Sequence, residues 1–280
     1  PLEAPVMIGT SRMRRIRSLD PVDRCAVVEA GVVNLDVSKA AAPHGLCYAP
    51  DPSSQMACTI GGNVAENSGG PHTLKYGVTT NHVLGVEMVL ADGSVVELGS
   101  PIADTPGYDL TGLAVGAEGT FGVVTAATLR LVPVPPACRT LLAVFATVEA
   151  ASATVSRIIR AGIVPAALEM MDQLIVGAVE AAYGFGFPTD AGAVLIVEVD
   201  GAAAAVAEDL DRVRSICTAG GASRVDVAGD GAERELLWKS RKRAFGAVGR
   251  LAPNYCTQDG VVPRGKVPAI LERIQATARR

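Results

Sequence analysis

The sequence is poor in charged and aromatic residues. Only 19% of its 280 residues are Asp, Glu, Lys or Arg, and only 4% are Phe, Trp or Tyr. The 25 basic and 29 acidic residues give a net charge of −4, which predicts no basic surface for nucleic acid. Because 49% of the residues are hydrophobic, the chain can bury a large core, which excludes intrinsic disorder.

Long apolar runs and closely spaced cysteines are also missing. Gly, Asp or Glu interrupts each apolar run before it could span a membrane, so no transmembrane segment is expected. Residues 1–20 carry their charges after a short apolar patch, the reverse of a signal peptide. None of the six cysteines is in CxxC spacing, which argues against zinc ribbons and thioredoxin chemistry and favours a cytoplasmic protein. No His, Cys or carboxylate cluster has metal-ligand spacing.

A proline-rich stretch at residues 131–138, LVPVPPAC, is the clearest boundary. Three prolines within four positions can continue neither a helix nor a central strand, so we interpret it as an interdomain linker. The predicted domains are therefore residues 1–134 and 135–280.

Residues 1–134 contain short elements separated by glycines. The pattern predicts strands at residues 25–33 and 123–132, and a hairpin over 82–99 that turns at Asp92 and Gly93. Asp109 is predicted to cap a short helix, and Asn34 to cap a helix that ends near Pro43.

Residues 135–280 alternate between the two kinds of element. We expect strands at 139–148, 166–172, 193–201 and 223–229, helices at 149–161, 173–182 and 201–218, and a long amphipathic helix over 232–251. This order predicts an α+β fold with a ferredoxin-like sheet that carries its helices on one face.

Residues 48–79, YAPDPSSQMACTIGGNVAENSGGPHTLKYGVT, form the most informative stretch. Glycine lets the backbone approach a ligand closely, and amides with small hydroxyls can cradle a pyrophosphate without a positive side chain. The stretch has few large apolar side chains, so we expect it to lie outside the core, without secondary structure. A ligand-binding loop and a flexible surface loop both fit this composition.

A second glycine-rich stretch lies at residues 115–125, VGAEGTFGVVT. It differs from the Rossmann fingerprint because the GxG pair is missing and the predicted strand follows the glycines. It fits a flat ring or a phosphate seated against the backbone, and it equally fits a tight turn from a helix into a strand.

Together, PDPSSQMACTIGGNVAENSGG and GAEGTFGVVT resemble the FAD-binding segments of the vanillyl-alcohol oxidase/PCMH flavoprotein family. Within that family, LKYGVT, LEMMD and the helix with Trp238 look like the flavin subunit of bacterial glycolate oxidase. The resemblance runs over essentially the whole chain. It implies a PCMH-type FAD-binding domain in residues 1–134, a ferredoxin-like α+β substrate domain in residues 135–280, and FAD as the cofactor.

The resemblance also implies roles for individual residues. The flavin ring and ribityl chain would lie against Pro50, Asp51, Ser53 and Ser54. Contacts near the ring and the diphosphate would come from Thr59, Gly61, Gly62, Asn63 and Ala65. The adenine end and the diphosphate would contact Glu118, Gly119, Gly122 and Val124.

Arg241 is the predicted substrate residue. It lies three positions after Trp238, so both share one face of the predicted helix. An arginine fork matches a carboxylate, and the resemblance implies that an arginine at this place binds the carboxylate of a 2-hydroxy acid. The alternative is that Arg241 belongs to a solvated basic face together with Lys239, Lys242 and Arg243.

Histidines are scarce, and a lone histidine is more often structural than catalytic. Of the three, His72 lies inside the flavin-like stretch and is a candidate for a catalytic role on the flavin or substrate side. Lys75 and Tyr76, in the same stretch, could also reach the site. His44 and His82 are expected to be structural.

Three segments of the family pattern are absent from the sequence. A PxGxGT loop is expected before Pro1, and HAGDGNxHP and EHG segments are expected after Arg280. Both domains are therefore expected to be partial. The GDG at residues 229–231 lacks the histidine of that family segment and is predicted to be an ordinary strand-to-helix turn.

The resemblance implies oxidation of a small (D)-2-hydroxy acid, such as glycolate or D-lactate, to the 2-oxo acid, with hydride transfer to the flavin. Companion subunits of a glycolate oxidase complex are the expected protein partners, and association with a membrane would occur through them. The alternative function is a non-catalytic flavin-binding or pairing subunit of such a complex.

Expressed alone, the 280-residue chain is expected to turn over no 2-hydroxy acid and to hold FAD weakly. Each missing hydrogen bond to a charged pyrophosphate is worth about 1.5–3 kcal/mol, so losing several weakens a tight site to about millimolar affinity. The flavin-to-protein ratio of the purified chain and an assay with glycolate and D-lactate measure both properties. Robust turnover would mean that a base lies within these residues, with His72 the first candidate.

Overall fold

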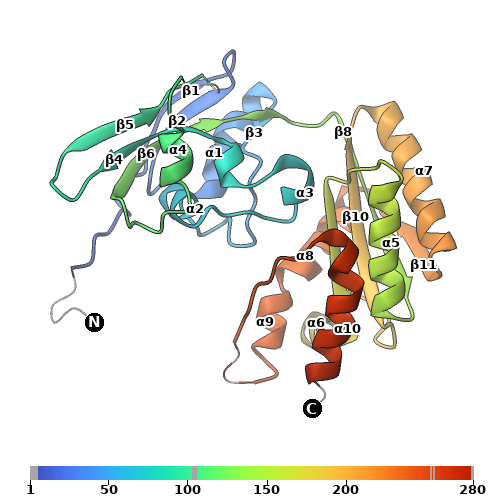
Figure 1. Ribbon diagram of the computed structural model, residues 1–280. Coiled ribbons are helices and arrows are strands. Elements are labelled where there is room, and N and C mark those ends of the chain that lie inside the picture. The colour runs from blue at the N-terminus through green and yellow to red at the C-terminus, as the bar shows by residue number, and fades with distance from the viewer. Residues whose placement is uncertain (1–5, 103–105, 253, 255, 279–280) are drawn as a thin grey trace. The chain divides into compact units, whose positions relative to one another are not determined.

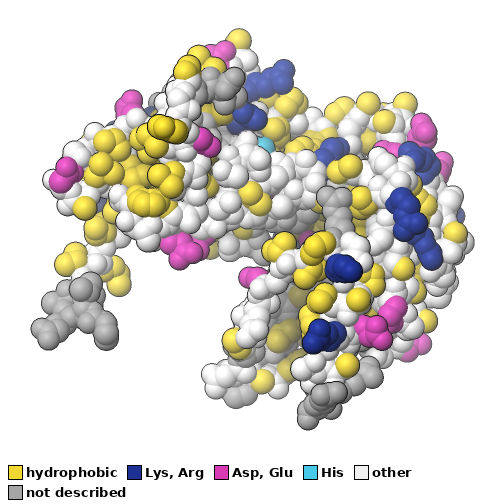
Figure 2. All heavy atoms as spheres, in the orientation of Figure 1, with side chains coloured by type: hydrophobic (Ala, Val, Ile, Leu, Met, Phe, Trp, Pro, Cys, Tyr) yellow, Lys and Arg dark blue, Asp and Glu magenta, His cyan; other side chains and the backbone are white. Residues whose placement is uncertain are grey.

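The computed structural model describes residues 6–102, 106–252, 254 and 256–278. Pro1 and Arg280, beyond which the missing family segments were expected, lie outside the described residues. The chain forms two compact units, Pro1–Val134 and Pro135–Arg280, and each has its own β-sheet with helices beside it (Figure 1). On the face in Figure 2, Lys and Arg side chains lie in small separate groups. None of the described helices has the length and apolar character needed to cross a bilayer.

The first unit is built on a five-stranded antiparallel sheet with the strand order β1-β2-β6-β4-β5. These strands are β1 (Ile16–Asp20), β2 (Cys25–Glu29), β4 (Val83–Val89), β5 (Val95–Gly99) and β6 (Val123–Arg130). A short pair joins β3 (Leu46–Cys47) to β7 (Val132–Pro133). The helices are α1 (Asn34–Ala41), α2 (Ile60–Glu66), α3 (Thr73–Tyr76) and α4 (Leu110–Ala114), with 3₁₀ turns η1 (Ala42–His44) and η2 (Thr79–Asn81).

Two local predictions in this unit are confirmed. Strands β4 and β5 form the expected hairpin, and Gly93 in its turn has a φ of +83°, which glycine adopts without strain. Asp109 caps α4, because its carboxylate accepts a hydrogen bond from the Gly112 amide at 2.7 Å. The prediction for Asn34 was wrong in detail. Asn34 begins α1, Val33 is the N-cap residue, and the Asn34 side chain is buried.

The prediction that residues 48–79 form an irregular loop outside the core was wrong. The stretch contains α2 and α3, and Ile60 and Val64 are both 0% exposed. These two residues are four apart, so a helix places them on one face, where they pack with Val28 and Leu129 of the sheet core. Two apolar residues at helical spacing therefore anchor a segment that is otherwise rich in glycine and small polar residues.

The second unit contains a four-stranded antiparallel sheet with the strand order β11-β8-β10-β9. Its strands are β8 (Ala137–Phe145), β9 (Ala167–Asp172), β10 (Ala193–Gly201) and β11 (Ala222–Val227). Its helices are α5 (Val148–Arg160), α6 (Gln173–Tyr183), α7 (Ala203–Ala219), α8 (Gly231–Lys242), α9 (Ala244–Val248) and α10 (Val267–Ala278), with a 3₁₀ turn η3 (Arg264–Lys266). The first and third strands of the unit lie in the middle, which is the expected ferredoxin-like order.

The expectation that all helices cover one face of this sheet was wrong. Alternate residues of β10 point into two separate cores. Leu195 and Val197 pack on the side of α5 and α7, whereas Val194 and Ile196 pack on the side of α6, α8 and α9. Every residue from 193 to 199 is buried, so both faces of the strand must be covered.

The predicted long helix over 232–251 is two helices, α8 and α9, separated at Arg243. Arg243 and Arg250, at the two ends of α9, lie 5.0 Å and 4.9 Å from the centre of the Tyr183 ring on α6. These cation–π contacts attach both ends of α9 to α6. Helical periodicity alone does not reveal the interruption at Arg243. The predicted turn before α8 is confirmed, since Asp230 caps the helix by accepting a hydrogen bond from the Glu233 amide at 2.9 Å.

Replacing Leu195 with Ala is expected to lower the free energy of unfolding of the second unit by about 2–5 kcal/mol, because Leu195 is fully buried at the centre of the sheet. Urea unfolding followed by the fluorescence of Trp238, the one tryptophan of the chain, measures the change. Leu174→Ala is the matched control, since Leu174 is 79% exposed and should change stability by less than about 0.5 kcal/mol. Equal losses for the two variants would contradict the assignment of this core.

Candidate functional site

The two glycine-rich stretches lie together in the first unit. The Gly116 amide donates a hydrogen bond to the carbonyl oxygen of Val64 at 2.8 Å, and the Glu118 amide donates to that of Ala65 at 3.0 Å. The last turn of α2 is therefore joined to the turn that precedes β6. Segments that are about fifty residues apart in the sequence form one continuous backbone region.

A buried pair of asparagines holds the start of this region. The Asn34 amide group donates to the Asn63 side-chain oxygen at 2.9 Å and to the Pro50 carbonyl oxygen at 3.0 Å. Asn34 and Asn63 are 1% and 2% exposed, so neither can exchange these partners for water. Asn63 also donates to the Ser68 hydroxyl at 3.3 Å. The pair fixes the turn at Pro50 against α2, and the role of Asn34 was missed from the sequence, where it resembled a helix cap.

Asp51 and His72 are in direct contact. The Nδ1 atom of His72 lies 2.8 Å from one carboxylate oxygen of Asp51, and the His72 amide donates to the other oxygen at 3.3 Å. Both side chains are largely but not fully buried. A carboxylate in this position orients an imidazole and favours the proton on Nδ1.

His82 has the structural role expected of it. Its Nε2 atom lies 2.8 Å from the carbonyl oxygen of Tyr76, and the residue is buried beside Tyr48. Burial lowers the pKa of His82, because it disfavours the charged imidazole.

Two different constraints favour glycine at positions in this region. A Cβ atom at Gly61 would lie 2.8 Å from the Cβ of Ala30, and one at Gly122 would lie 2.5 Å from the carbonyl oxygen of Val89. Packing within the protein explains these two. At Gly62 the nearest atom to an added Cβ is the Thr59 hydroxyl at 3.7 Å, and Gly62 is exposed. Its backbone therefore faces open space that a ligand can approach, as an FAD site requires.

Two of the three non-glycine residues with positive φ in the described part of the chain lie in the same region. Asn67 and Glu118 have φ values of +49° and +50°, which are uncommon for residues with a side chain. Gly116 and Gly119, on either side of Glu118, have φ values of +80° and +75°. Such conformations tend to be retained at ligand-binding sites.

The predicted cofactor residues all belong to this region, but they differ in exposure. Two of them are buried, Pro50 and Asn63. Five are exposed, namely Ser53, Ser54, Gly62, Glu118 and Gly119. The others have intermediate exposure, namely Asp51, Thr59, Gly61, Ala65, Gly122 and Val124. Val124 packs against the hydrophobic core, so any cofactor contact at this position would come from its backbone. Together, the joined stretches, the exposed glycine backbone and the small hydroxyls fit FAD.

In the second unit, α8 docks on the sheet through charged groups. The carboxylate of Glu198 on β10 is 1% exposed and accepts hydrogen bonds from Arg234 Nε and a terminal nitrogen, both at 2.8 Å. It also accepts from Trp238 Nε1 at 2.6 Å and from the Thr140 hydroxyl at 2.5 Å. The hydrogen bonds to Glu198 raise the pKa of Arg234 further above its ordinary value, and burial, with the nearby Glu198 charge, raises the pKa of the Cys138 thiol to about 12.

Arg241 lies one turn beyond Trp238, and its Nε donates to Glu169 on β9 at 2.5 Å. This hydrogen bond uses Nε and leaves the terminal nitrogens of the guanidinium for a second acceptor. Lys239, in contrast, is exposed, as expected for a solvated face. Glu169 and Glu198 were missed from the sequence, although an acidic residue in the middle of an apolar strand was the available signal in both cases.

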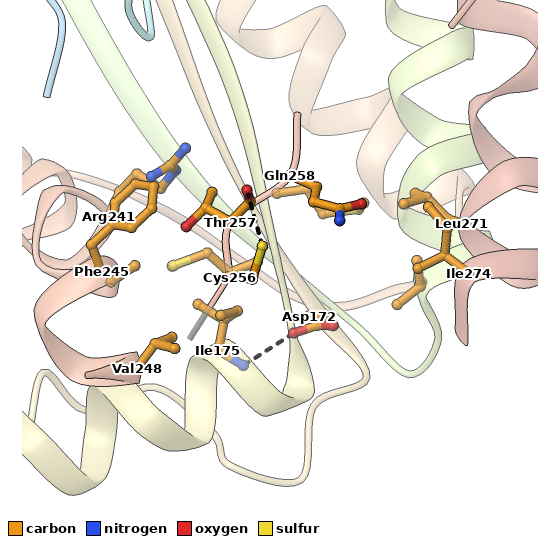
Figure 3. Close-up of a pocket in the computed structure, with 14 residues that line it drawn as sticks. Asp172, Ile175, Arg241, Phe245, Val248, Cys256, Thr257, Gln258, Leu271 and Ile274 are labelled. Carbon is orange, nitrogen blue, oxygen red and sulfur yellow. Dashed lines mark hydrogen bonds between the residues drawn. The ribbon is translucent and has the colours of Figure 1, made fainter. Parts of the chain in front are cut away.

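Arg241 also lines a cavity of 520 Å³ within the second unit (Figure 3). The apolar lining residues are Val148, Met170, Met171, Ile175, Ala244, Phe245, Val248, Leu271 and Ile274, and the others are Asp172, Cys256, Thr257 and Gln258. The cavity lies beside β9, which is one of the two edge strands of the sheet. A single guanidinium in a largely apolar cavity can bind one carboxylate.

The family assignment follows from comparison with known proteins. The family described as FAD linked oxidases, C-terminal domain, matches residues 134–280, and the FAD binding domain family matches residues 2–99. The chain therefore belongs to the FAD-linked oxidases, and its cofactor is FAD.

Individual relatives make the likeness more specific. The chain is 49% identical to glycolate oxidase subunit GlcD of Escherichia coli K12, over 98% of this chain and 55% of that protein. It is 42% identical to GlcD of Bacillus subtilis, over 99% of this chain and 59% of that protein. It is 32% identical to D-lactate dehydrogenase of Anaerostipes hadrus, over 95% of this chain and 58% of that protein. The chain thus spans little more than half the length of these relatives. A solved alkyldihydroxyacetonephosphate synthase has the same fold, with a TM-score of 0.79 at 18% identity over 95% of this chain and 55% of that one.

Replacing Gly62 with Leu is expected to abolish FAD binding with little change in the stability of the apoprotein, because the new side chain would extend into the space open to a ligand. The matched control is Gly61→Ala, whose Cβ would clash with Ala30 and should destabilise the apoprotein by about 1–3 kcal/mol. Flavin-to-protein ratios and denaturant unfolding of the apo forms separate the two effects. A Gly62→Leu variant that keeps stoichiometric FAD would remove Gly62 from the cofactor site.

Proposed function

We propose that the protein to which this chain belongs oxidises a small (D)-2-hydroxy acid to the 2-oxo acid, with Arg241 as the anchor for the substrate carboxylate. The observation that carries this proposal is the place of Arg241 on the wall of the cavity, with Nε held by Glu169. A guanidinium oriented in this way presents its two terminal nitrogens to a carboxylate. The similarity to proteins named glycolate oxidase and D-lactate dehydrogenase supports the same substrate class.

The geometry of α8 supports the role of Arg241. Arg234, Trp238 and Arg241 are spaced by four and three residues, so they lie along one side of the helix. The first two bind Glu198 on the central strand, and the third binds Glu169 on the edge strand. The helix is thereby fixed in rotation, and the Arg241 side chain keeps one direction.

We assign the cofactor site to the joined glycine-rich stretches of the first unit. The turn at Pro50, Asp51, Ser53 and Ser54 is proposed to hold the ring and ribityl chain. The neighbouring ring and diphosphate region is proposed to be held by Thr59, Gly61, Gly62, Asn63 and Ala65. The adenine end and the diphosphate are proposed to contact Glu118, Gly119, Gly122 and Val124. Bound FAD supplies the two-electron oxidation. Within the chain, His72 is the candidate for holding a proton close to the cofactor, because Asp51 orients its imidazole.

Companion subunits are part of the proposal. The similar proteins from Escherichia coli and Bacillus subtilis are named as subunits of glycolate oxidase, which supports assembly into a complex of that kind. The six cysteines are scattered along the sequence with no CxxC pair, which supports a reducing, cytoplasmic location.

Replacing Arg241 with Met in the FAD-loaded protein is expected to lower kcat/KM for the hydroxy acid at least roughly 30-fold, because losing a desolvated charge pair costs about 2–5 kcal/mol. The flavin content should stay unchanged. Lys239→Met on the exposed side of the same helix is the matched control and should behave as the unmodified protein. Steady-state rates with an artificial electron acceptor measure the effect. Unchanged kinetics for Arg241→Met would mean that Arg241 belongs to a solvated basic face and binds no substrate. A flavin-loaded protein that oxidises no 2-hydroxy acid would favour the alternative function, a pairing subunit.

A further inference from the structure

The cavity beside Arg241 has few charged groups in its lining. Among the described residues that line it, Arg241 is the one cation and Asp172 the one acid. The carboxylate of Asp172 already accepts a hydrogen bond from the Ile175 amide at 3.0 Å, as the cap of α6. Most of the remaining wall is apolar, with Met170 from β9, Phe245 and Val248 from α9 and Leu271 from α10. Figure 3 shows Phe245, Val248 and Ile175 gathered on the same side as Arg241.

The size of the cavity exceeds what the smallest hydroxy acid needs. Its 520 Å³ is within the range of pockets that bind small organic ligands. Glycolate has no side chain, so it would leave the apolar wall in contact with water. An aliphatic side chain would remove this wall from water and gain affinity with each methylene group.

A second carboxylate on the substrate would be poorly accommodated. Glu169 occupies Nε of Arg241 and partly offsets its positive charge, and the first carboxylate would use the terminal nitrogens. No further cation lines the cavity within the described part of the chain, so a second carboxylate would lose its hydration without a partner.

We propose that this cavity is the side-chain subsite of the enzyme, and that it selects 2-hydroxy monocarboxylates with a short apolar side chain over glycolate and over dicarboxylic hydroxy acids. Phe245 is the residue that determines this selectivity, because it follows Arg241 by four positions and lines the same cavity. The proposal rests on the proposed function, since it takes Arg241 as the carboxylate anchor.

A series of 2-hydroxy acids tests the selectivity in the FAD-loaded protein: achiral glycolate and the (D)-enantiomers of lactate, 2-hydroxybutyrate, 2-hydroxyisocaproate and 2-hydroxyglutarate. From glycolate to 2-hydroxyisocaproate, kcat/KM is expected to rise by about 4-fold for each buried methylene group. The dicarboxylic 2-hydroxyglutarate is expected to be at least roughly 100-fold worse than 2-hydroxyisocaproate, because its second carboxylate stays unpaired. Preference for glycolate or for 2-hydroxyglutarate would overturn the proposal.

Phe245→Lys places a second cation at the wall and should reverse the ranking. It is expected to raise kcat/KM for 2-hydroxyglutarate, and to lower it for 2-hydroxyisocaproate, by about 10-fold each. Leu236→Lys is the matched control, because Leu236 is 46% exposed on α8, close to the 49% of Phe245, and does not line the cavity. An unchanged ranking in Phe245→Lys, with normal flavin content and Trp238 fluorescence, would overturn the role of Phe245.

Calorimetric binding of 4-methyl-2-oxopentanoate, the 2-oxo acid product from 2-hydroxyisocaproate, separates this inference from the proposed function. Binding to the unmodified protein that is weakened about 10-fold in Phe245→Lys, without turnover of any 2-hydroxy acid, would support the subsite and contradict the proposed reaction. Turnover of 2-hydroxy acids without such binding would support the reaction and contradict the subsite. If the Lys variant does not fold, the acid series on the unmodified protein still decides the selectivity.

Discussion

The buried carboxylate of Glu198 is the group around which the second unit is organised. A charged group removed from water is tolerated only when it is paired and its hydrogen-bonding capacity is filled. Arg234, Trp238 and Thr140 satisfy this requirement from α8 and β8. Since two of these partners lie on α8, the helix has one favourable rotation on the sheet. The direction of Arg241, and with it the charged wall of the cavity, depends on this single arrangement.

A similar constraint operates in the first unit, with neutral groups. Asn34 and Asn63 are buried polar residues whose hydrogen bonds join α1, the turn at Pro50 and α2. Leaving either unsatisfied would cost about 1–3 kcal/mol, so the glycine-rich backbone is held in one conformation. These hydrogen bonds position α2, whose exposed Gly62 faces open space.

Several elements could be predicted from local chemistry. The sequence predicted the Asp92-Gly93 hairpin, the Asp109 cap, the turn before α8 and the four strands of the second unit. These features follow from turn residues, capping side chains and apolar runs, which act over a few neighbouring positions. The contacts of α9 with the Tyr183 ring could not be predicted, because Tyr183 lies some sixty residues earlier in the chain. The two-sided burial of β10 was missed for a related reason. A continuous apolar run leaves open which helices cover each face.

The sequence by itself determined the family, the FAD cofactor, the ferredoxin-like class of the second unit and the segments that contain the proposed site residues, because motifs and periodicity are properties of nearby residues. Only the tertiary structure decided which residues meet. It joined Ala65 to Glu118, Asp51 to His72, Asn34 to Asn63 and Arg241 to Glu169. It also distinguished Gly61, which packs against Ala30, from Gly62, which faces open space, although the two are adjacent in the chain. Such contacts form when distant segments come together to bury apolar surface and to satisfy buried polar groups. The order of residues along the chain does not specify these distances.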